Sequence, residues 1–598
     1  MKVKPISWLS RITLLGVAAL LVSVAQGTSP IESTVSAIAG RLTEAFTPEE
    51  LRGLTEETLR PFVKPAELRS LASEYWRFDV NVPVVVSVMR DANQTALPFW
   101  LEGAGFAKAD LVVRNEYTTY EVWQRAYDAG SVGLGINGFD KHRPHYFVSV
   151  GAQDPDARLE LTNFVPEDQQ VFEMGVGASI YHDWPELVLS EVPEALEGQA
   201  LLPTIRGRAR EAHLIGAFRE TAFPSAADPD QVLLTWNGDP RTSMAVQWRT
   251  SPSTERGFVC YREADAAADA PWSEVVASMR ALDDPLIINE RRVHRFTATL
   301  SGLKPGTAYA YRVGDPESER ISDAATFQTA PATPEPFTFF FLSDTHNSPA
   351  AGALLDAALA RDPDAAFALI SGDLVGTGQY RDDWDNFFAY GAPFMARRPV
   401  MPSIGNHDAI DGLGADLYLA HFELPENGPA SLAPQRTYAF EYGNAIFLMM
   451  DVTEPIAAQT SWIDAQLEQT SAKWNFAVMH FPPYFPEDSE AAIREAWIPV
   501  LDRHHVDFAL AGHVHTYMRS HPMRGGECVA SPAEGTTYLI TISLDDGGAM
   551  PPKPDYAAVM KKPGVALYVR FRIEEARVVL DALDRDGNVF DMYTVERP

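Results

Sequence analysis

Basic residues are scarce in this sequence of 598 residues. It contains 49 Lys and Arg against 81 Asp and Glu, which gives a formal net charge of -32 at pH 7. Nucleic acids and anionic membranes are polyanions, so a chain this acidic is not expected to bind either one as a general partner. An anionic ligand would meet the same repulsion unless bound metal cations reverse the field locally.

Cysteine is nearly absent as well. Cys260 lies in the strand-like run Phe258–Tyr261, and Cys528 lies in what we expect to be a different domain. A buried free thiol is the simpler interpretation of Cys260. A disulfide between the two remains open but is not predicted.

Long apolar runs are missing after the first 27 residues. The one such run, residues 12–24, follows three basic residues, and the small residues Ser23 and Ala25 stand at positions suited to cleavage. The run is short for a bilayer span, so the sequence predicts a signal peptide over residues 1–27. We therefore expect an exported protein, periplasmic or secreted, without stable membrane insertion; an uncleaved anchor is the lesser alternative.

The remaining chain is too long for a single hydrophobic core, so several domains are expected. Residues 28–225 read as an α+β region that resembles no known family. Residues 31–77 have a helical pattern, in which Thr47 precedes Pro48 and two acidic residues as at a helix start. Strand patterns follow over residues 78–181, including Val80–Met89, His145–Val150 and Gln170–Tyr181.

Two features of this first region suggest sites but have simpler interpretations. Gly133 to Gly138 spells G-x-G-x-x-G, yet turn-forming residues follow it where a dinucleotide fingerprint needs a helix. We interpret it as a glycine-rich bend between strands. His142 and His145 are a candidate metal pair, but surface or core histidines are the default without further ligands beside them.

Residues 228–330 alternate with period two in short runs separated by turn residues such as Asn237–Pro240. Regular short strands over about 100 residues predict a β-sandwich. The proline-rich segment Thr329–Pro336 follows and is typical of a short stiff linker.

From Phe337 onward, continuous apolar runs alternate with helical stretches, which predicts a buried α/β sheet in a domain over residues 336–598. Such sheets place their sites just past the carboxyl ends of strands. Five runs end in residues that bind metals or move protons: Asp344 and His346, then Asp373, then Asn406, His407 and Asp408, then His480, and finally His513 and His515.

Together, the motifs D-x-H, G-D, G-N-H-D, H and G-H-x-H resemble the signature of the calcineurin-like metallophosphoesterases. Gly302–Gly306, Tyr309–Gly314 and Leu448–Asp451 further resemble the purple acid phosphatases, and that resemblance covers about residues 228–598. It implies a multidomain protein in which a fibronectin-like β-sandwich precedes an α/β/β/α metallophosphoesterase sandwich, with the α+β region added in front.

The resemblance also implies a binuclear metal site. Asp373 would bridge two ions, with Asp344, His346 and His515 completing the first site and Asn406, His480 and His513 the second. The ligand types suit divalent Mn, Fe, Zn, Co or Ni without choosing among them. His407 would stabilise the phosphoryl group and protonate the leaving oxygen. Asp408 would either orient His407 or cap a helix.

The sequence departs from the purple acid phosphatases at Gly376, where that family places a tyrosine ligand, and at His346, which that family lacks. The iron–tyrosinate colour is therefore expected to be absent. Tyr380 remains open as a substitute ligand.

We expect an exported phosphatase that hydrolyses small phosphoric monoesters by attack of a metal-bound hydroxide. One alternative is a phosphodiesterase acting on nucleotides or glycerophospho-compounds. An alternative of another class is a surface-binding protein with a relict catalytic domain, although every expected ligand position is filled. The sequence does not indicate an oligomeric state.

Overall fold

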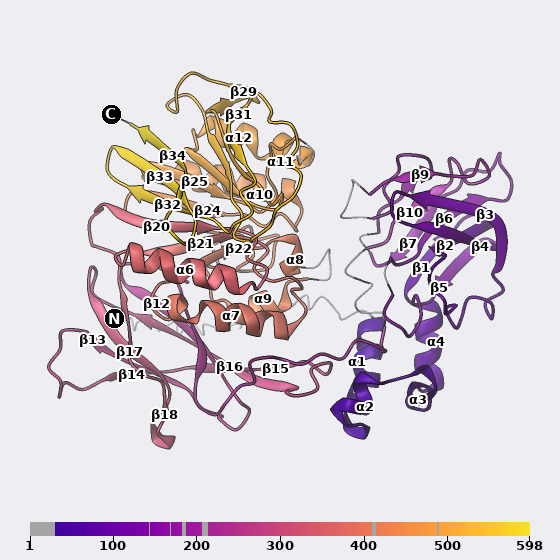
Figure 1. The fold of residues 1–598 in the computed structure, drawn as a ribbon, viewed down its shortest axis with the longest axis horizontal. Helices are drawn as coiled ribbons and strands as arrows, with labels where there is room; N and C mark the ends of the chain where they lie inside the picture. The colour runs from indigo at the N-terminus through magenta and orange to yellow at the C-terminus, as the bar shows by residue number, and fades with distance from the viewer. Residues whose placement is uncertain are drawn as a thin grey trace, which may run out of the picture.

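The computed structural model describes residues 30–597 except 143, 168, 182–186, 206–207, 209–212, 410–413 and 487–489. The segment expected to be a signal peptide therefore lies outside the described residues. Within the described part of the chain, no helix combines the length and hydropathy needed to cross a bilayer. The N-terminal region stands to one side of a larger body formed by the rest of the chain (Figure 1).

The N-terminal region begins with short helices packed against strands. The helix start predicted at Thr47 and Pro48 is present, and Thr47 forms a capping box with Glu50. The helices are α1 (Pro30–Ala45), α2 (Pro48–Arg52), α3 (Glu56–Leu59), the 3-10 helix η1 (Arg60–Phe62) and α4 (Pro65–Ser73). The strands are β1 (Trp76–Val80), β2 (Val84–Asp91), β3 (Ala107–Asn115), β4 (Thr119–Tyr127), β5 (Gly130–Leu134), β6 (Phe147–Ala152), β7 (Leu161–Val165), β8 (Phe172–Glu173), β9 (Leu189–Glu191) and β10 (Ala200–Leu202).

These strands form a three-stranded sheet, β5-β1-β7, and a seven-stranded sheet, β8-β10-β6-β2-β4-β3-β9, among the described residues. The prediction of a strand over Gln170–Tyr181 is wrong beyond the two residues of β8, because a turn at Gly175–Gly177 interrupts the segment. The G-x-G-x-x-G segment starts in β5 and continues as irregular chain with no helix, as expected.

The second region is the predicted β-sandwich. Its two sheets have the orders β11-β12-β16-β15 and β14-β13-β17-β18, with β19 paired to β17. Both cysteines are free, Cys260 buried in β13 and Cys528 exposed. The elements are β11 (Asp230–Thr235), β12 (Ser243–Thr250), β13 (Phe258–Glu263), β14 (Ser273–Val276), β15 (Ser278–Asp283), β16 (Arg292–Ser301), β17 (Ala308–Asp315), η2 (Pro316–Ser318), β18 (Arg320–Ile321) and β19 (Ala325–Gln328).

The third region, the predicted catalytic domain, has two facing sheets, β22-β21-β20-β32-β33-β34 and β23-β24-β25-β26-β30-β27-β31, in agreement with the predicted fold class. Its strands are β20 (Phe337–Leu342), β21 (Phe367–Ser371), β22 (Val400–Ser403), β23 (Tyr438–Tyr442), β24 (Ala445–Met449), β25 (Trp474–Val478), β26 (Phe508–Ala511), β27 (Tyr517–Ser520), β28 (Met523–Arg524), β29 (Glu527–Cys528), β30 (Thr537–Ile540), β31 (Ala557–Lys561), β32 (Tyr568–Ile573), β33 (Arg577–Leu583) and β34 (Val589–Glu596).

Helices cover the outer faces of both sheets. Side chains of α6 and α7 join the core of the first sheet, and those of α10, α11 and α12 join the core of the second. The helices are α6 (Pro349–Arg361), α7 (Arg381–Met395), α8 (Asn406–Ala409), α9 (Asp416–His421), α10 (Ile456–Gln469), α11 (Ala491–Ala496) and α12 (Ile498–Arg503).

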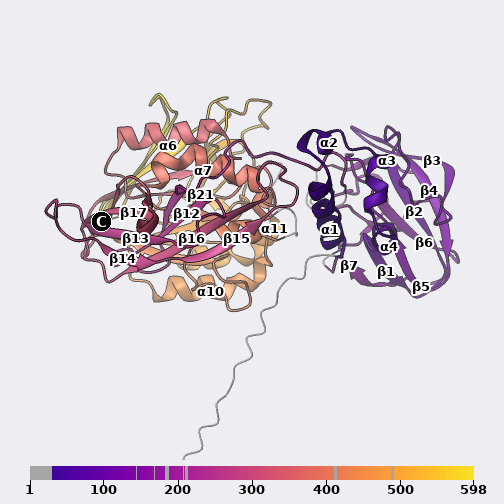
Figure 2. The same cartoon turned by 90° about the horizontal axis from the view of Figure 1, so that it is seen from below.

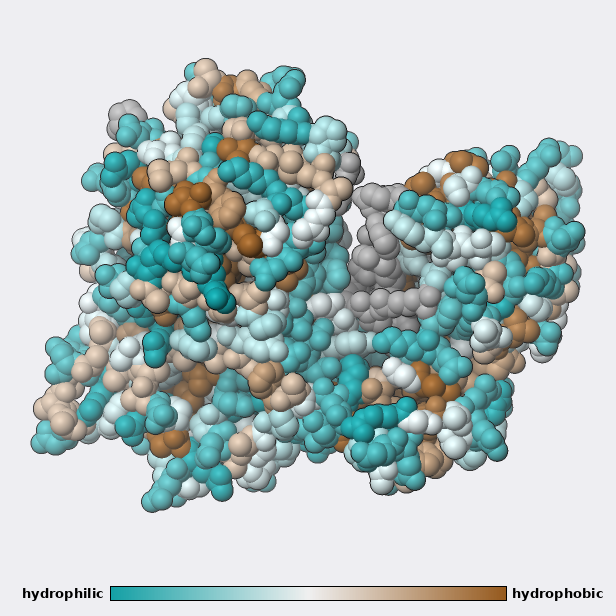
Figure 3. Space-filling view, in the orientation of Figure 1, coloured by the Kyte–Doolittle hydropathy of each residue, from teal (hydrophilic) through white to brown (hydrophobic). Residues whose placement is uncertain are grey.

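The sandwich and the catalytic domain share one hydrophobic core. Trp236 of the sandwich packs its ring 5.4 Å from that of Phe367 in β21. Arg249 Nη1 of the sandwich donates to Asp385 Oδ1 in α7 at 2.7 Å, and both side chains are 1% exposed. The sandwich strands lie beneath α7 in Figure 1 and in front of the same body in Figure 2, where it is seen from below. On the face seen in Figure 3, hydrophobic residues form only small patches among hydrophilic ones.

Candidate metal centre

The predicted ligands all lie at one edge of the catalytic sheets. Strands β20, β21 and β22 are parallel, as are β24, β25 and β26, so their carboxyl ends meet where the two sheets face each other. The structure brings together Asp344 and His346 after β20, Asp373 after β21, Asn406 after β22, His480 after β25, and His513 and His515 after β26.

The backbone at the ligands is unusual. Five of them have positive φ: Asp344 (52°), His346 (40°), Asp373 (51°), His513 (73°) and His515 (46°). Asp and His enter this left-handed region more readily than most residues, and such conformations concentrate at functional sites. The strained turns aim the side chains of separate strands at one point.

Glycines let the ligand loops approach each other. A Cβ on Gly405 would lie 2.2 Å from Asp373 Oδ1, and one on Gly512 would lie 2.4 Å from Asp344 Oδ2. These distances are far below a normal contact. Glycine before Asn406 and before His513 is therefore required for the ligands to converge.

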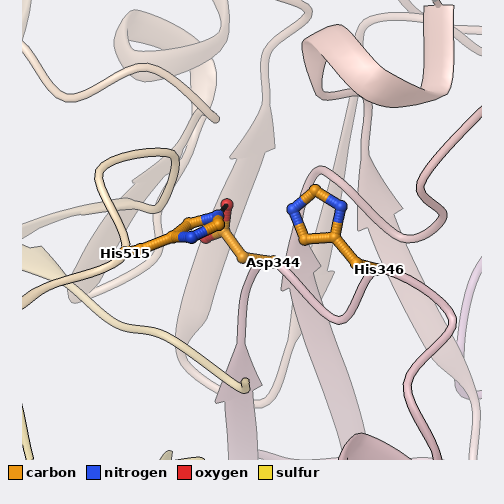
Figure 4. A group of neighbouring side chains, drawn as sticks. All are labelled: Asp344, His346 and His515. Atoms are coloured by element: carbon orange, nitrogen blue, oxygen red, sulfur yellow. Dashed lines mark ion pairs between the residues drawn. The ribbon is translucent and has the colours of Figure 1, made fainter. Parts of the chain in front are cut away.

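The first ligand cluster contains Asp344, His346 and His515, whose ligand atoms lie within 4.8 Å of one another. Figure 4 shows the two imidazoles on opposite sides of the aspartate. His346 Nε2 is buried without a hydrogen-bond partner. Burial lowers the pKa of His346 to about 4, so its ring is neutral at pH 7 and offers a lone pair. An orphaned buried nitrogen beside two carboxylates fits a metal ligand.

The second cluster contains Asp373, His480 and His513, again within 4.8 Å. His480 Nε2 lies 3.1 Å from Asp373 Oδ2 and 3.1 Å from Asn406 Oδ1. Amide, imidazole and carboxylate donors therefore converge here, whereas the first cluster combines imidazole and carboxylate donors alone.

Asp373 lies beside residues of both clusters. Its Oδ2 lies 3.6 Å from His346 Nε2 of the first cluster and 3.1 Å from His480 Nε2 of the second. Its Oδ1 accepts a hydrogen bond of 2.9 Å from the backbone nitrogen of His407, which fixes the orientation of the carboxylate. A single carboxylate thus faces two sets of donors.

The electrostatics of the site favour cations. Burial raises the pKa of Asp373, but the nearby imidazoles of His480 and His407 outweigh burial and hold that pKa well below its usual range. Burial lowers the pKa of His480, and the charge of Asp373 outweighs it and raises this pKa to about 9. Similarly, Asp344 raises the pKa of His515 to about 9 against burial. The buried carboxylates thus make the surroundings of both imidazoles favourable for positive charge.

Hydrogen-bond partners outside the two clusters orient the imidazoles of His480 and His515. His480 Nδ1 donates to the carbonyl of Ser371 at 2.7 Å, and His515 Nδ1 donates to Asp546 Oδ2 at 3.0 Å. In both rings this leaves Nε2 facing the cluster, as partners of this kind do in metal sites. The sequence analysis did not find Asp546. It follows β30, which is parallel to β26, so the strand-end rule that found the ligands applies to it as well.

His407 stands next to the two clusters. Its ring centroid is 4.7 Å from that of His346, and its Nδ1 donates to the carbonyl of Gly376 at 2.8 Å. Because Nδ1 is held in this way, Nε2 is the ring nitrogen left to exchange a proton with a molecule bound at the site. His407 is half-buried, while its neighbours Asn406 and Asp408 are buried.

Asp408 does not orient the His407 ring. Its Oδ1 accepts from the backbone nitrogens of Leu374 (2.9 Å) and Val375 (3.2 Å), and its Oδ2 accepts from that of Gly405 (2.9 Å). These contacts are closer to the capping alternative than to orientation of His407, and a catalytic role for Asp408 stays a prediction. This buried carboxylate ties the loop after β21 to the loop after β22, which places Asp373 beside Asn406.

Gly376 stands where the purple acid phosphatases place a tyrosine, and its backbone is held by a side chain. Gly376 donates its backbone nitrogen to Asn347 Oδ1 at 2.8 Å. Tyr380, the open substitute, has its ring beneath the guanidinium of Arg219, with 3.7 Å from the guanidinium carbon to the ring centroid. Its phenol ring is thus part of a contact with the segment that precedes the sandwich.

Known families match these two domains. The purple acid phosphatase N-terminal domain matches residues 229–329, and the calcineurin-like phosphoesterase domain matches residues 337–517. The chain carries the two domains of a purple acid phosphatase-like metallophosphoesterase. It is a metal-dependent phosphoester hydrolase.

Relatives of this metallophosphoesterase are distant in sequence. The protein Rv2577 of Mycobacterium tuberculosis is 27% identical over 376 residues, covering 54% of this chain and 69% of the relative. The probable purple acid phosphatase 20 of Arabidopsis thaliana is 27% identical over 310 residues, covering 49% and 69%. The structure of purple acid phosphatase PPD1 from yellow lupin seeds has a TM-score of 0.53 at 15% identity, covers 88% of this chain and 91% of that one, and supports the fold alone.

Proposed function

We propose that this metallophosphoesterase is an exported phosphatase that hydrolyses small phosphoric monoesters with two divalent metal ions. The observation that carries the proposal is the position of Asp373, whose carboxylate faces His346 of one cluster and His480 of the other. A carboxylate shared in this way is what two closely spaced cations need to stay together.

The residues fit two ions. Asp344, His346 and His515 would hold the first, Asn406, His480 and His513 the second, and Asp373 would be shared. When bound, such ions supply an activated water and neutralise charge on the phosphoryl group. The donors are oxygen and imidazole nitrogen without thiolate, which suits Mn, Fe, Zn, Co or Ni.

His407 would deliver a proton to the leaving oxygen. Its Nδ1 is fixed by the carbonyl of Gly376, so Nε2 is the ring nitrogen that would face the ester. An imidazole suits this task because it is the side chain that most often transfers protons in enzymes. Asp408 supports the reaction only by holding the loops that carry Asp373 and Asn406.

A small phosphorylated substrate has to approach a chain of the same sign of charge. The net charge of -32 repels phosphate at long range, and the metal cations would reverse the field close to the site.

We propose export from residues 1–27, on the sequence pattern alone. Cell fractionation of the full chain tests it: the protein should lose this segment and appear outside the cytoplasm, and cytoplasmic retention of the intact chain would contradict export.

The decisive experiment combines metal analysis with rates on matched chromogenic monoesters and diesters. About two divalent ions per chain and faster turnover of the monoester are expected. A higher rate on the diester would favour the phosphodiesterase alternative. Failure of the folded protein to bind metal under any loading would contradict the catalytic proposal.

The iron-loaded, oxidised protein should lack a strong visible charge-transfer band, because Gly376 supplies no phenolate and Tyr380 stacks on Arg219. Absorption spectroscopy checks this. A strong band that disappears in Tyr380→Phe would show that Tyr380 is a ligand after all.

A further inference from the structure

Arg219 joins three parts of the molecule. It lies in the segment that leads from the N-terminal region to the sandwich. Its Nη2 donates to Asp284 Oδ2 of the β15–β16 turn at 2.7 Å, and its Nε donates to Asp382 Oδ1 at the start of α7 at 2.8 Å. Its guanidinium also covers the ring of Tyr380. The side chain is 14% exposed, so these contacts are largely shielded from water.

The backbone of Arg219 is fixed to the same turn. Its nitrogen donates to the carbonyl of Leu286 at 2.8 Å, and its carbonyl accepts from the nitrogen of Ile288 at 3.0 Å. The side chain therefore projects from a fixed point toward the catalytic domain. Figure 1 shows this turn, between β15 and β16, reaching toward α1 of the N-terminal region.

The chain just before α7 is the part that holds His407. The carbonyl of Gly376 accepts from His407 Nδ1 at 2.8 Å, and the backbone nitrogen of Gly378 donates to the carbonyl of His407 at 2.7 Å. A Cβ on Gly378 would lie 1.7 Å from the carbonyl oxygen of Asp408, so the two loops are in direct contact. A shift of residues 376–380 would move the His407 ring and backbone together.

Packing alone does not hold this loop on its outer side. A cavity of about 300 Å³ lies there, bounded by α1, the β15–β16 turn and residues 378–381. Atoms that border a cavity have lost contacts on that side. The contacts of Arg219 with Tyr380 and Asp382 span the same junction and supply a connection there.

We propose that Arg219 is a positioning residue for His407. By pinning Tyr380 and the start of α7 to the sandwich, it keeps residues 376–380 in place, and these residues hold the imidazole against the leaving oxygen. This gives the segment after the N-terminal region a part in catalysis. The inference rests on the proposed function in assigning His407 its role. The contacts of Arg219 with Tyr380 and Asp382, here called the clamp, can be tested without substrate.

The test compares Arg219→Ala with Arg52→Ala in the full chain. Arg52 pairs with Glu220, the neighbour of Arg219, and with Glu49, so its loss removes ion pairs at the same junction without touching the loop. Hydrogen exchange of residues 374–380 should accelerate in Arg219→Ala and stay unchanged in Arg52→Ala. Tyr380→Ala should reproduce the effect, whereas Tyr380→Phe keeps the ring and should behave as the parent.

Catalysis should change in a pattern specific to His407. With metal content retained, Arg219→Ala should lower kcat about 10–100-fold on an alkyl phosphate, since a small misplacement has effects of this size. The loss should be clearly smaller on an aryl phosphate, whose leaving group needs little protonation. Arg219→Lys can pair with one carboxylate but not both and should recover only part of the rate.

The outcomes separate the two proposals. Faster exchange together with the leaving-group pattern supports the inference. Unchanged exchange, or an equal loss on both esters, overturns it. If the parent hydrolyses neither ester while Arg219→Ala still loosens the loop, the clamp stands and the proposed function fails.

Discussion

Two buried histidines in this molecule differ in what surrounds them. In the N-terminal region, His145 has its ring centroid 5.0 Å from those of both Tyr75 and Tyr146, and burial lowers its pKa to about 3. In the catalytic domain, His480 is 0% exposed, yet the carboxylate of Asp373 raises its pKa to about 9. Burial disfavours the charged ring in both places.

The two rings differ in the negative carboxylate beside His480, which would attract a metal cation as it attracts a proton. His145 is further surrounded by Arg208, His213 and His142, whose charges lower its pKa still more. His142 has a carboxylate of its own, with 3.0 Å from its Nε2 to Asp91 Oδ2, but the pair has no further ligand in the groups that could hold a metal among the described residues. A metal centre needs several donors of complementary charge at one point.

The largest effect should come from removing the shared carboxylate. Asp373→Asn should release at least one ion and lower activity more than about 10³-fold, beyond the loss caused by one neutral hydrogen-bond donor. Metal analysis and kcat/KM check this. Asp91→Asn is the matched control, because it alters a carboxylate–histidine pair of the N-terminal region. Near-normal turnover in Asp373→Asn would refute the ligand assignment.

His407→Ala should keep both ions and lower kcat about 10²–10⁴-fold, the usual contribution of a general acid or base. The loss should be larger for alkyl than for aryl phosphates, because an alkoxide needs the proton more. Rates across a series of leaving groups measure this. A uniform loss would indicate that His407 positions the phosphoryl group instead.

Asp546→Asn should weaken metal binding about 10–100-fold, the effect typical of a partner that orients a ligand histidine. Calorimetric titration of the metal-free protein measures the affinity directly. Asp464→Asn provides the control, since Asp464 Oδ1 lies 2.6 Å from His504 Nε2 away from the metal centre. Equal affinities in the two variants would show that Asp546 does not support His515.

The smallest effect concerns stability alone. The pKa of His145 is lowered from 6.5 to about 3 in the folded chain, so the unfolded state takes up its proton first as pH falls. The contribution of the neutral His145 to the free energy of unfolding is fully present above pH about 6.5. Below that pH it should fall by on the order of 1 kcal/mol per pH unit. His145→Phe should remove this part of the acid sensitivity without changing activity. Acid unfolding midpoints check it, with the exposed His521 changed to Gln as control; identical midpoints in parent and His145→Phe would contradict the account.

Local patterns in the sequence predicted much of the fold. Thr47 and Pro48 mark a helix start because capping depends on neighbouring residues, and Phe337–Leu342 forms a strand with the predicted bounds. The error at Gln170–Tyr181 has a local cause too, the turn at Gly175–Gly177. Apolar content alone did not reveal that break.

The sequence by itself determined the types of the candidate metal ligands and their places after strand ends, because parallel strands must deliver those residues to one edge. Tertiary structure decided the rest. The positive φ of Asp344, Asp373 and His513 and the shared position of Asp373 depend on loops that meet only in the folded chain. The contacts of Asp408 and of Arg219 likewise join segments 34 and 163 residues apart, which no local pattern records.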